Sequence, residues 1–155
     1  MEDIWNITAL VVSVLSVLLS LYALRQATTK NTSDMYLFFI SQYAKEDMKL
    51  ALRKLKDIKR GVYRLEQWES DMKNNLPKAF EYDEARRLVK YFYDTLAYMK
   101  LEKLIEARFV RLICLKKGAW LYLDTVEAME KFFDSGYDKN PYAVIRDVCE
   151  NLRKE

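Results

Sequence analysis

The chain has 155 residues, of which 51% are hydrophobic and 32% are charged, with a net charge of +3 and only 3 Gly and 2 Pro. This composition excludes a disordered chain, because there are ample apolar side chains for a core, and the scarcity of turn residues favours an all-α fold. The chain has no histidine and 2 Cys, which removes the commonest general base and metal ligand and leaves too few thiols for a four-cysteine zinc site.

The N-terminal segment from Ile4 to Leu24 is apolar and carries no charged side chain. As a helix it would be about 31 Å long, which matches the hydrocarbon thickness of a bilayer. Acidic residues precede it and basic residues follow it, so the positive-inside rule places the N-terminus outside and the remainder in the cytoplasm. We therefore expect residues 1–24 to be a single-pass transmembrane anchor in the cell membrane. A cleaved signal peptide and a buried core helix are the alternatives.

Small side chains recur in this segment at spacings of 4, 3, 4 and 3 residues, at Ala9, Ser13, Ser16, Ser20 and Ala23. On an α-helix they fall within an arc of about 80°, and leucines occupy the other faces. Small residues let two membrane helices approach closely, so we interpret this face as a packing surface for a partner helix. The alternative is that the serines carry no role, because a serine hydroxyl can bond to a carbonyl of its own helix. The partner could be a second copy of the chain or another subunit.

Residues 25–33 are predicted to be a polar linker, and residues 34–155 a cytoplasmic bundle of about five to seven helices. Between residues 45 and 60, apolar side chains recur at helical spacing and the pattern ends near Gly61. These apolar positions are Met48, Leu52, Leu55 and Ile58.

The charge is unevenly distributed, because residues 25–60 contain nine basic and four acidic side chains. Six bases on the predicted helix account for most of this excess: Lys49, Arg53, Lys54, Lys56, Lys59 and Arg60. They could contact anionic lipid or an acidic patch on a partner, or they could simply form a solvated helix face. We do not expect nucleic acid as a partner, because the chain has no recognisable nucleic-acid-binding motif and little net charge.

Beyond Gly61, the sequence predicts a short helix around Trp68 and a new element beginning at Pro77. A long helix follows from about residue 81, with a break near residues 100–103 and another helix from about residue 118 to 133. The inner face of the long helix is expected to carry Leu88, Phe92, Leu96 and Met99, with Ala85, Val89 and Tyr93 beside them. Asn140 and Pro141 are typical of the first residues of a final helix.

We expect no catalytic residue, no metal and no cofactor. The acidic residues Glu81, Asp83 and Glu84 fit the start of a helix, where the helix dipole favours negative charge. Asp94 lies in the aromatic run YFYDTLAYM and offers the alternative of a Tyr/Asp/Arg pocket for a small ligand or a reaction, although a solvated carboxylate also fits. Cys114 and Cys149 lie in apolar patterns typical of buried thiols, with a disulfide or a redox switch as the alternative.

The segment RRLVKYFYDTLAYMKLEKLIEARFVRLI, followed by WLYLDTVEAMEKFF with Trp120, resembles an uncharacterised prokaryotic family. The resemblance covers about two thirds of the chain and implies one N-terminal membrane pass followed by a small helical cytoplasmic domain. By architecture alone, the chain also looks like accessory subunits of prokaryotic energy-conserving complexes, such as the sodium-pumping methyltransferase of methanogens. The resemblance has no chemical motif, so it assigns no site residues.

The sequence thus predicts a non-catalytic, membrane-anchored accessory or regulatory subunit that binds a larger membrane protein complex and the lipid bilayer. A membrane-tethered ligand sensor or enzyme with a pocket near Asp94 is the alternative. Association of the chain with its own copies also remains open.

Overall fold

The computed structural model describes the backbone of residues 2–133 and 136–153. It describes the side chains of these residues from Leu15 onward, except those of residues 25, 27–29, 31, 32 and 153. Two compact units divide the chain, Met1–Met35 and Tyr36–Glu155. Every regular element in the described residues is helical, which confirms the all-α prediction.

The elements follow one another as α1 (Glu2–Ala44), α2 (Glu46–Lys59), α3 (Leu65–Lys73), α4 (Pro77–Leu101), α5 (Ala107–Cys114), α6 (Lys117–Leu121), the π-helical η1 (Tyr122–Val126), α7 (Glu127–Phe133) and α8 (Asn140–Arg153). Residues 25–33 continue the helix α1. The division into an anchor (1–24), a linker (25–33) and a helical domain (34–155) stays a prediction.

The prediction of a transmembrane anchor is wrong. Across the part of the chain that the structure describes, a helix sufficiently long and apolar to pass through a bilayer is not found. The helix α1 does not end with the apolar segment but continues through the polar residues 25–33 to Ala44, so the apolar run is one part of a longer helix of mixed composition. The fold class is therefore corrected to an all-helical chain, with no membrane span identified among the residues that the structure describes.

The helix α2 is amphipathic, as its apolar spacing predicts. Met48, Leu55 and Ile58 are buried and Leu52 is half-buried, so the predicted face is the one that packs against α4. The helix ends before Gly61, whose φ of 74° lies in the left-handed region that glycine adopts without strain.

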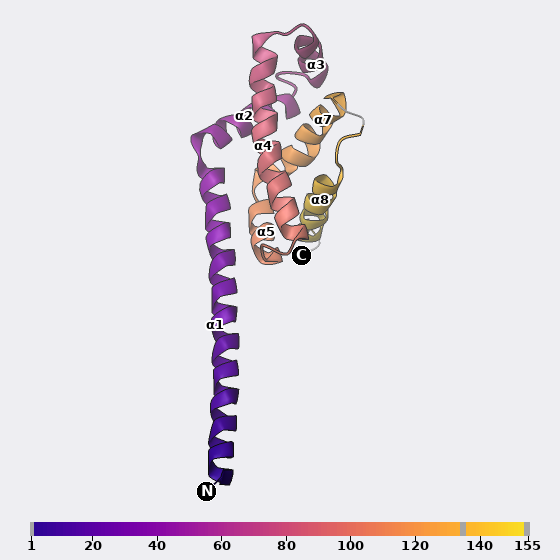
Figure 1. The fold of residues 1–155 in the computed structure, drawn as a ribbon. Coiled ribbons are helices and arrows are strands. Elements are labelled where there is room, and N and C mark those ends of the chain that lie inside the picture. The colour runs from indigo at the N-terminus through magenta and orange to yellow at the C-terminus, as the bar shows by residue number, and fades with distance from the viewer. Residues whose placement is uncertain (1, 134–135, 154–155) are drawn as a thin grey trace. The chain divides into compact units, whose positions relative to one another are not determined.

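The helices α3 and α4 are joined by a short turn, and Trp68 fixes their arrangement. The Trp68 ring is fully buried, and its Nε1 donates a hydrogen bond to the carbonyl of Ala79 at 3.2 Å. Pro77 lies in the first turn of α4, where its missing N–H costs nothing. Figure 1 shows α4 running along the bundle, with α3 at its N-terminal end and α8 beside it.

The inner face of α4 is only partly as predicted. Phe92 and Leu96 are buried, together with Val89, but Leu88 is 38% exposed. The buried face is therefore rotated slightly from the predicted one, toward Ala85, Val89 and Tyr93, which were expected beside it and are all buried. The helix ends at Leu101, within the range predicted for a break.

The predicted helix from about residue 118 to 133 is divided into α6, η1 and α7. The π-helical turn η1 lies between the two short α-helices and follows and precedes them without a gap in the chain. Gly118 in α6 approaches two tyrosines closely: its N–H donates to the Tyr43 hydroxyl at 3.2 Å, and a Cβ there would lie 2.8 Å from the Tyr93 hydroxyl and 2.9 Å from that of Tyr43. At α8, the Asn140 N–H donates to the Asp138 carboxylate at 2.9 Å, so the start of this helix was predicted correctly.

Candidate functional site

Of the six predicted bases in and directly after α2, three form ion pairs and three form none with the described residues. Lys49 pairs with Glu46 at 3.3 Å within the helix. Lys54 pairs with Glu81 of α4 at 3.0 Å. These two ammonium groups are partly neutralised, so they contribute less to any attraction for an external anion.

The other bases lie further along α2. Lys59 forms an ion pair with Asp124 of η1. Arg53, Lys56 and Arg60 are exposed, and they have no ion pair among the described residues. Unpaired charge on α2 is therefore concentrated on these three side chains.

Two of these unpaired bases line a groove that sequence analysis did not predict. Its lining consists of Lys56 and Lys59 from α2, Arg60 directly after it, and Lys117, Trp120 and Leu121 from α6, and we call it the basic groove. Its volume is about 450 Å³. Four cationic side chains thus line the groove together with an indole ring and a leucine, the two apolar side chains that we call its apolar floor.

The small-residue face on α1 is described only in part. Ser16, Ser20 and Ala23 are exposed, and the Ser20 hydroxyl donates to the Ser16 carbonyl at 2.8 Å within the helix. Ala9 and Ser13 lie outside the residues whose side chains the structure describes. Ser20 can therefore satisfy its hydroxyl locally, and the role of the small residues in packing stays a prediction.

Large apolar side chains surround the described part of this face. Seven of the ten residues from Leu15 to Leu24 are large and apolar, and each is between 53% and 67% exposed. At 100° per residue they point in nearly every direction outside the small-residue arc. Contiguous apolar surface of this extent is typical of an interaction site.

The carboxylate of Asp94, around which a Tyr/Asp/Arg pocket was the alternative prediction, is held by two contacts within the chain. The Lys90 ammonium contacts one carboxylate oxygen at 2.5 Å, and the Tyr122 hydroxyl donates to the other at 2.5 Å. The ring of Tyr122 stacks between those of Tyr93 and Tyr142, at centroid distances of 5.1 and 4.4 Å. Core packing therefore accounts for Phe92 and Tyr93 of the aromatic run, whereas Tyr91 and Tyr98 are exposed.

A buried charged cluster lies beside Asp94. The guanidinium of Arg86 contacts Asp83 at 2.7 Å and forms a second ion pair with Glu130 of α7. These side chains are only 9%, 3% and 11% exposed. Arg87, which is 71% exposed, also contacts Asp83, at 2.8 Å.

Sequence reasoning missed this cluster because it explained Asp83 by the helix dipole at a helix start and not by an ion pair. The available signal was the spacing of an acid with bases three and four residues later, which permits ion pairs within one helix. The contact between Arg86 and Glu130 joins α4 to α7 and had no signal of its own in the sequence. The arrangement is suited to fixing these helices together.

The Tyr142 hydroxyl is fully buried and has no hydrogen-bond partner among the described residues. Burial raises the pKa of Tyr142, and the nearby carboxylates of Asp94 and Glu127 raise it further. Glu127 itself accepts a hydrogen bond from the Tyr137 hydroxyl at 2.7 Å and pairs with Arg146 at 2.5 Å. The neutral phenol is therefore strongly favoured at this position.

The two cysteines are buried thiols and are not joined in a disulfide, as expected from the apolar patterns around them. A hydrogen bond with Cys149 raises the pKa of Cys114, and burial raises it further, so the thiolate is disfavoured. Among the described residues, no group of three or more Cys, Asp or Glu side chains is arranged to hold a metal ion.

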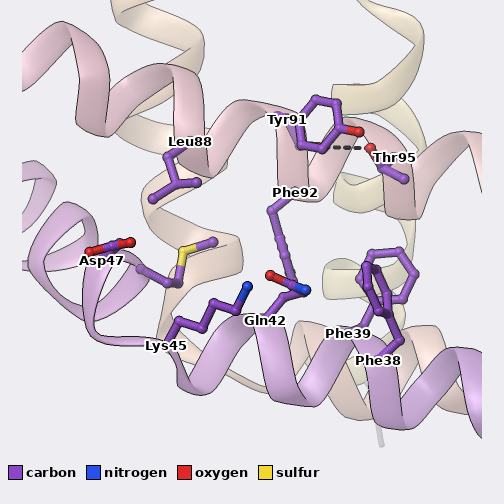
Figure 2. A pocket seen from close by; sticks show the side chains of 10 residues that line it. Phe38, Phe39, Gln42, Lys45, Asp47, Leu88, Tyr91, Phe92 and Thr95 are labelled. Atoms are coloured by element: carbon purple, nitrogen blue, oxygen red, sulfur yellow. Dashed lines mark hydrogen bonds between the residues drawn. The ribbon is translucent and has the colours of Figure 1, made fainter.

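A second groove lies between the end of α1 and α4. Its volume is about 360 Å³, and Figure 2 shows Leu88 and Phe92 pointing from α4 toward Lys45 and Gln42. Phe38, which also lines it, is 55% exposed. This groove is more apolar in its lining residues than the basic groove and contributes further exposed apolar surface.

Comparison of the chain with protein-family models, with curated proteins and with solved structures finds no match. The resemblance to a prokaryotic family therefore remains an expectation drawn from the sequence pattern.

Proposed function

We propose that the chain is a non-catalytic interaction protein, an accessory or regulatory subunit that uses exposed helical surface to bind a larger protein complex. The observation that carries the proposal is the run of exposed apolar side chains from Leu15 to Leu24 on α1. Exposing such a surface to water is unfavourable, at about 25 cal/mol for each Å² of apolar area. Binding of a partner would remove that cost.

The small-residue face is the part of α1 best suited to close contact with a partner helix. Ser16 and Ser20 lie one turn apart, and the hydroxyl of Ser20 is satisfied within the helix. A partner helix can therefore approach the backbone there without having to supply a hydrogen bond. The remaining leucines would contact further apolar surface of the complex.

The partner that fits this surface best is a complex associated with a membrane, because such a complex presents apolar helices with which α1 can pack. We therefore expect the chain in the membrane fraction together with its partner. This location depends on the partner and not on any catalytic chemistry of the chain.

The test is isolation of the tagged full chain in a mild detergent, followed by size-exclusion chromatography and mass spectrometry of the complex. The wild type is expected in a complex of fixed stoichiometry. The double variant Ser16→Leu, Ser20→Leu should lose the partner, because two bulky side chains prevent close approach. The matched control Leu18→Phe, Leu21→Phe adds bulk on other faces and should retain it.

A monomeric wild type, or a complex equally stable in both double variants, would contradict the proposal. Recovery of the chain with lipid and without any protein partner would also contradict it. An enzyme or sensor centred on Asp94 has less support, since Lys90 and Tyr122 already occupy the carboxylate.

A further inference from the structure

We propose that the basic groove binds an acidic segment of the partner protein, one that carries an apolar side chain between its carboxylates. This inference rests on the proposed function, because it names the chemistry of the partner. It concerns a surface on α2 and α6 that is separate in sequence from the small-residue face.

Charge complementarity is the first argument for an acidic occupant. Lys56, Arg60 and Lys117 are exposed cations that have no ion pair among the described residues. They come from two helices and line the same groove. Like charges gathered in this way repel each other, so a bound anionic group would relieve repulsion as well as gain attraction.

An internal contact shows that this surface accepts a carboxylate. Asp124 reaches Lys59 from η1, and both side chains are nearly half exposed, at 48% and 45%. The pair leaves the other cations of the groove available. A carboxylate from a partner could occupy them in the same manner.

The apolar floor favours a protein segment over a small anion. Trp120 is half-buried and Leu121 is buried, and both line the same groove as the cations. Inorganic phosphate would leave this floor in contact with water. A peptide with acidic residues on either side of a leucine would cover the floor and neutralise the rim at once.

The volume of the groove is also appropriate. At about 450 Å³ it can hold a few side chains and is much larger than a site for a single small anion. The arginine adds planar donors that can hold a carboxylate with two parallel hydrogen bonds.

The probe is a fluorescein-labelled peptide of alternating Asp, Glu and Leu residues, titrated into the tagged full chain at low salt and followed by fluorescence anisotropy. A second peptide with the same charge and with Ser in place of Leu measures the contribution of the apolar floor. Binding of the Leu peptide is expected to be about tenfold tighter than that of the Ser peptide. It should weaken as salt increases, because the cations are exposed.

The variant that tests the site is Lys56→Gln, Arg60→Gln, which should weaken binding of the Leu peptide roughly tenfold. The matched control is Arg53→Gln, Arg64→Gln, which removes the same charge from exposed positions outside the groove. The control should bind the peptide as the wild type does. Circular dichroism of both variants checks that the fold is retained.

Vesicles of phosphatidylglycerol and inorganic phosphate distinguish the other anionic occupants. If the vesicles bind in a manner that depends on Lys56 and Arg60 while the Leu peptide does not, the inference is overturned in favour of a lipid headgroup. Equal binding of the peptide to both double variants, or no binding to the wild type, also overturns it.

Failure here is distinguishable from failure of the proposed function. A complex that depends on Ser16 and Ser20, isolated from a chain that ignores the acidic peptide, would leave the proposed function intact and remove the basic groove from it. Binding of the acidic peptide by a chain that forms no complex would contradict the proposed function and leave binding at the basic groove intact.

Discussion

Replacing Arg86 by Met tests whether the buried charged cluster holds α4 to α7. Arg86 is the only cation of the cluster that is itself buried, and it contacts two buried carboxylates, those of Asp83 and Glu130, within the described part of the chain. Methionine fills much of the same volume and cannot pair with either carboxylate. The variant therefore leaves Asp83 with only the exposed Arg87, at 2.8 Å, and Glu130 with only Lys90, at 4.0 Å, among the described cations.

The expected cost is large. Removing one member of a buried ion pair typically destabilises a protein by about 3–5 kcal/mol, because the remaining charge stays desolvated. The guanidinium of Arg86 also lies 4.7 Å from the ring centroid of Phe133, and loss of this contact adds about 0.5–1 kcal/mol. The total of about 4 kcal/mol should lower the melting temperature by roughly 12 °C for a domain of this size.

The assay is urea denaturation followed by circular dichroism, with thermal melting as a second measurement. The matched control is Arg87→Met, because Arg87 also contacts Asp83 but is 71% exposed, and it should cost about 1 kcal/mol or less. Adding Asp83→Asn and Glu130→Gln to Arg86→Met should recover part of the loss. Equal destabilisation by Arg86→Met and Arg87→Met would refute the reasoning, and no recovery in the triple variant would attribute the loss to packing alone.

Three further predictions follow from the core. Tyr142→Phe should leave the free energy of unfolding unchanged or raise it, because the hydroxyl that it removes is buried and has no hydrogen-bond partner among the described residues. Tyr122→Phe should lower the free energy of unfolding by about 1–3 kcal/mol, because it removes a hydrogen bond to a carboxylate. Urea denaturation compares the two variants, and a greater loss of stability in Tyr142→Phe would contradict the prediction. Cys114 and Cys149 should resist a colorimetric thiol reagent in the native protein and react fully in denaturant, because both are buried and the pKa of Cys114 is raised. Fast labelling of the native protein would contradict this prediction, because it would show that the thiols are accessible. Gly118→Ala should destabilise the chain by about 1–3 kcal/mol, because the new methyl group would lie within 3 Å of two tyrosine hydroxyl oxygens, and an unchanged melting curve would show that the tyrosines move aside freely.

The elements that could be predicted are those whose signals are local. The apolar spacing on α2 and the glycine at its end were sufficient to predict the helix and its buried face, including Leu55 and Ile58. The proline at the start of α4 was sufficient for that boundary. On α4 the prediction placed Leu88 inside, and the structure exposes it, because the helix is long and tertiary packing selects among adjacent faces.

The transmembrane prediction depended on the apolar length of residues 4–24, considered without the rest of the chain. The apolar length from Ile4 to Leu24 matched a bilayer, but no membrane span is identified in the described residues. The same segment nevertheless leaves exposed apolar side chains, so the hydrophobic pattern did identify a surface that is unusual for a helix in water.

The candidate sites could be predicted only where their residues are neighbours in the chain. The bases of α2 were identified, but their pairing was not, because Glu81 and Asp124 reach Lys54 and Lys59 from distant elements. The basic groove likewise needs Lys117 from α6. Periodicity assigns charged side chains to the surface, so it could not have indicated a buried carboxylate such as that of Asp83.

The π-helical turn η1 has a consequence for the angular relation between the groove and the charged cluster. A π turn contains one residue more than an α turn, so the side chains of α7 are rotated by about 100° around the helix axis relative to those of a continuous α-helix. With this extra residue, Asp124 in the turn faces Lys59 of α2 while Glu130 beyond the turn faces Arg86 of α4. Deleting one residue of η1 would let the segment wind as a uniform helix and shift Glu130 by about 100° relative to Asp124, so these two contacts could not both stay in phase.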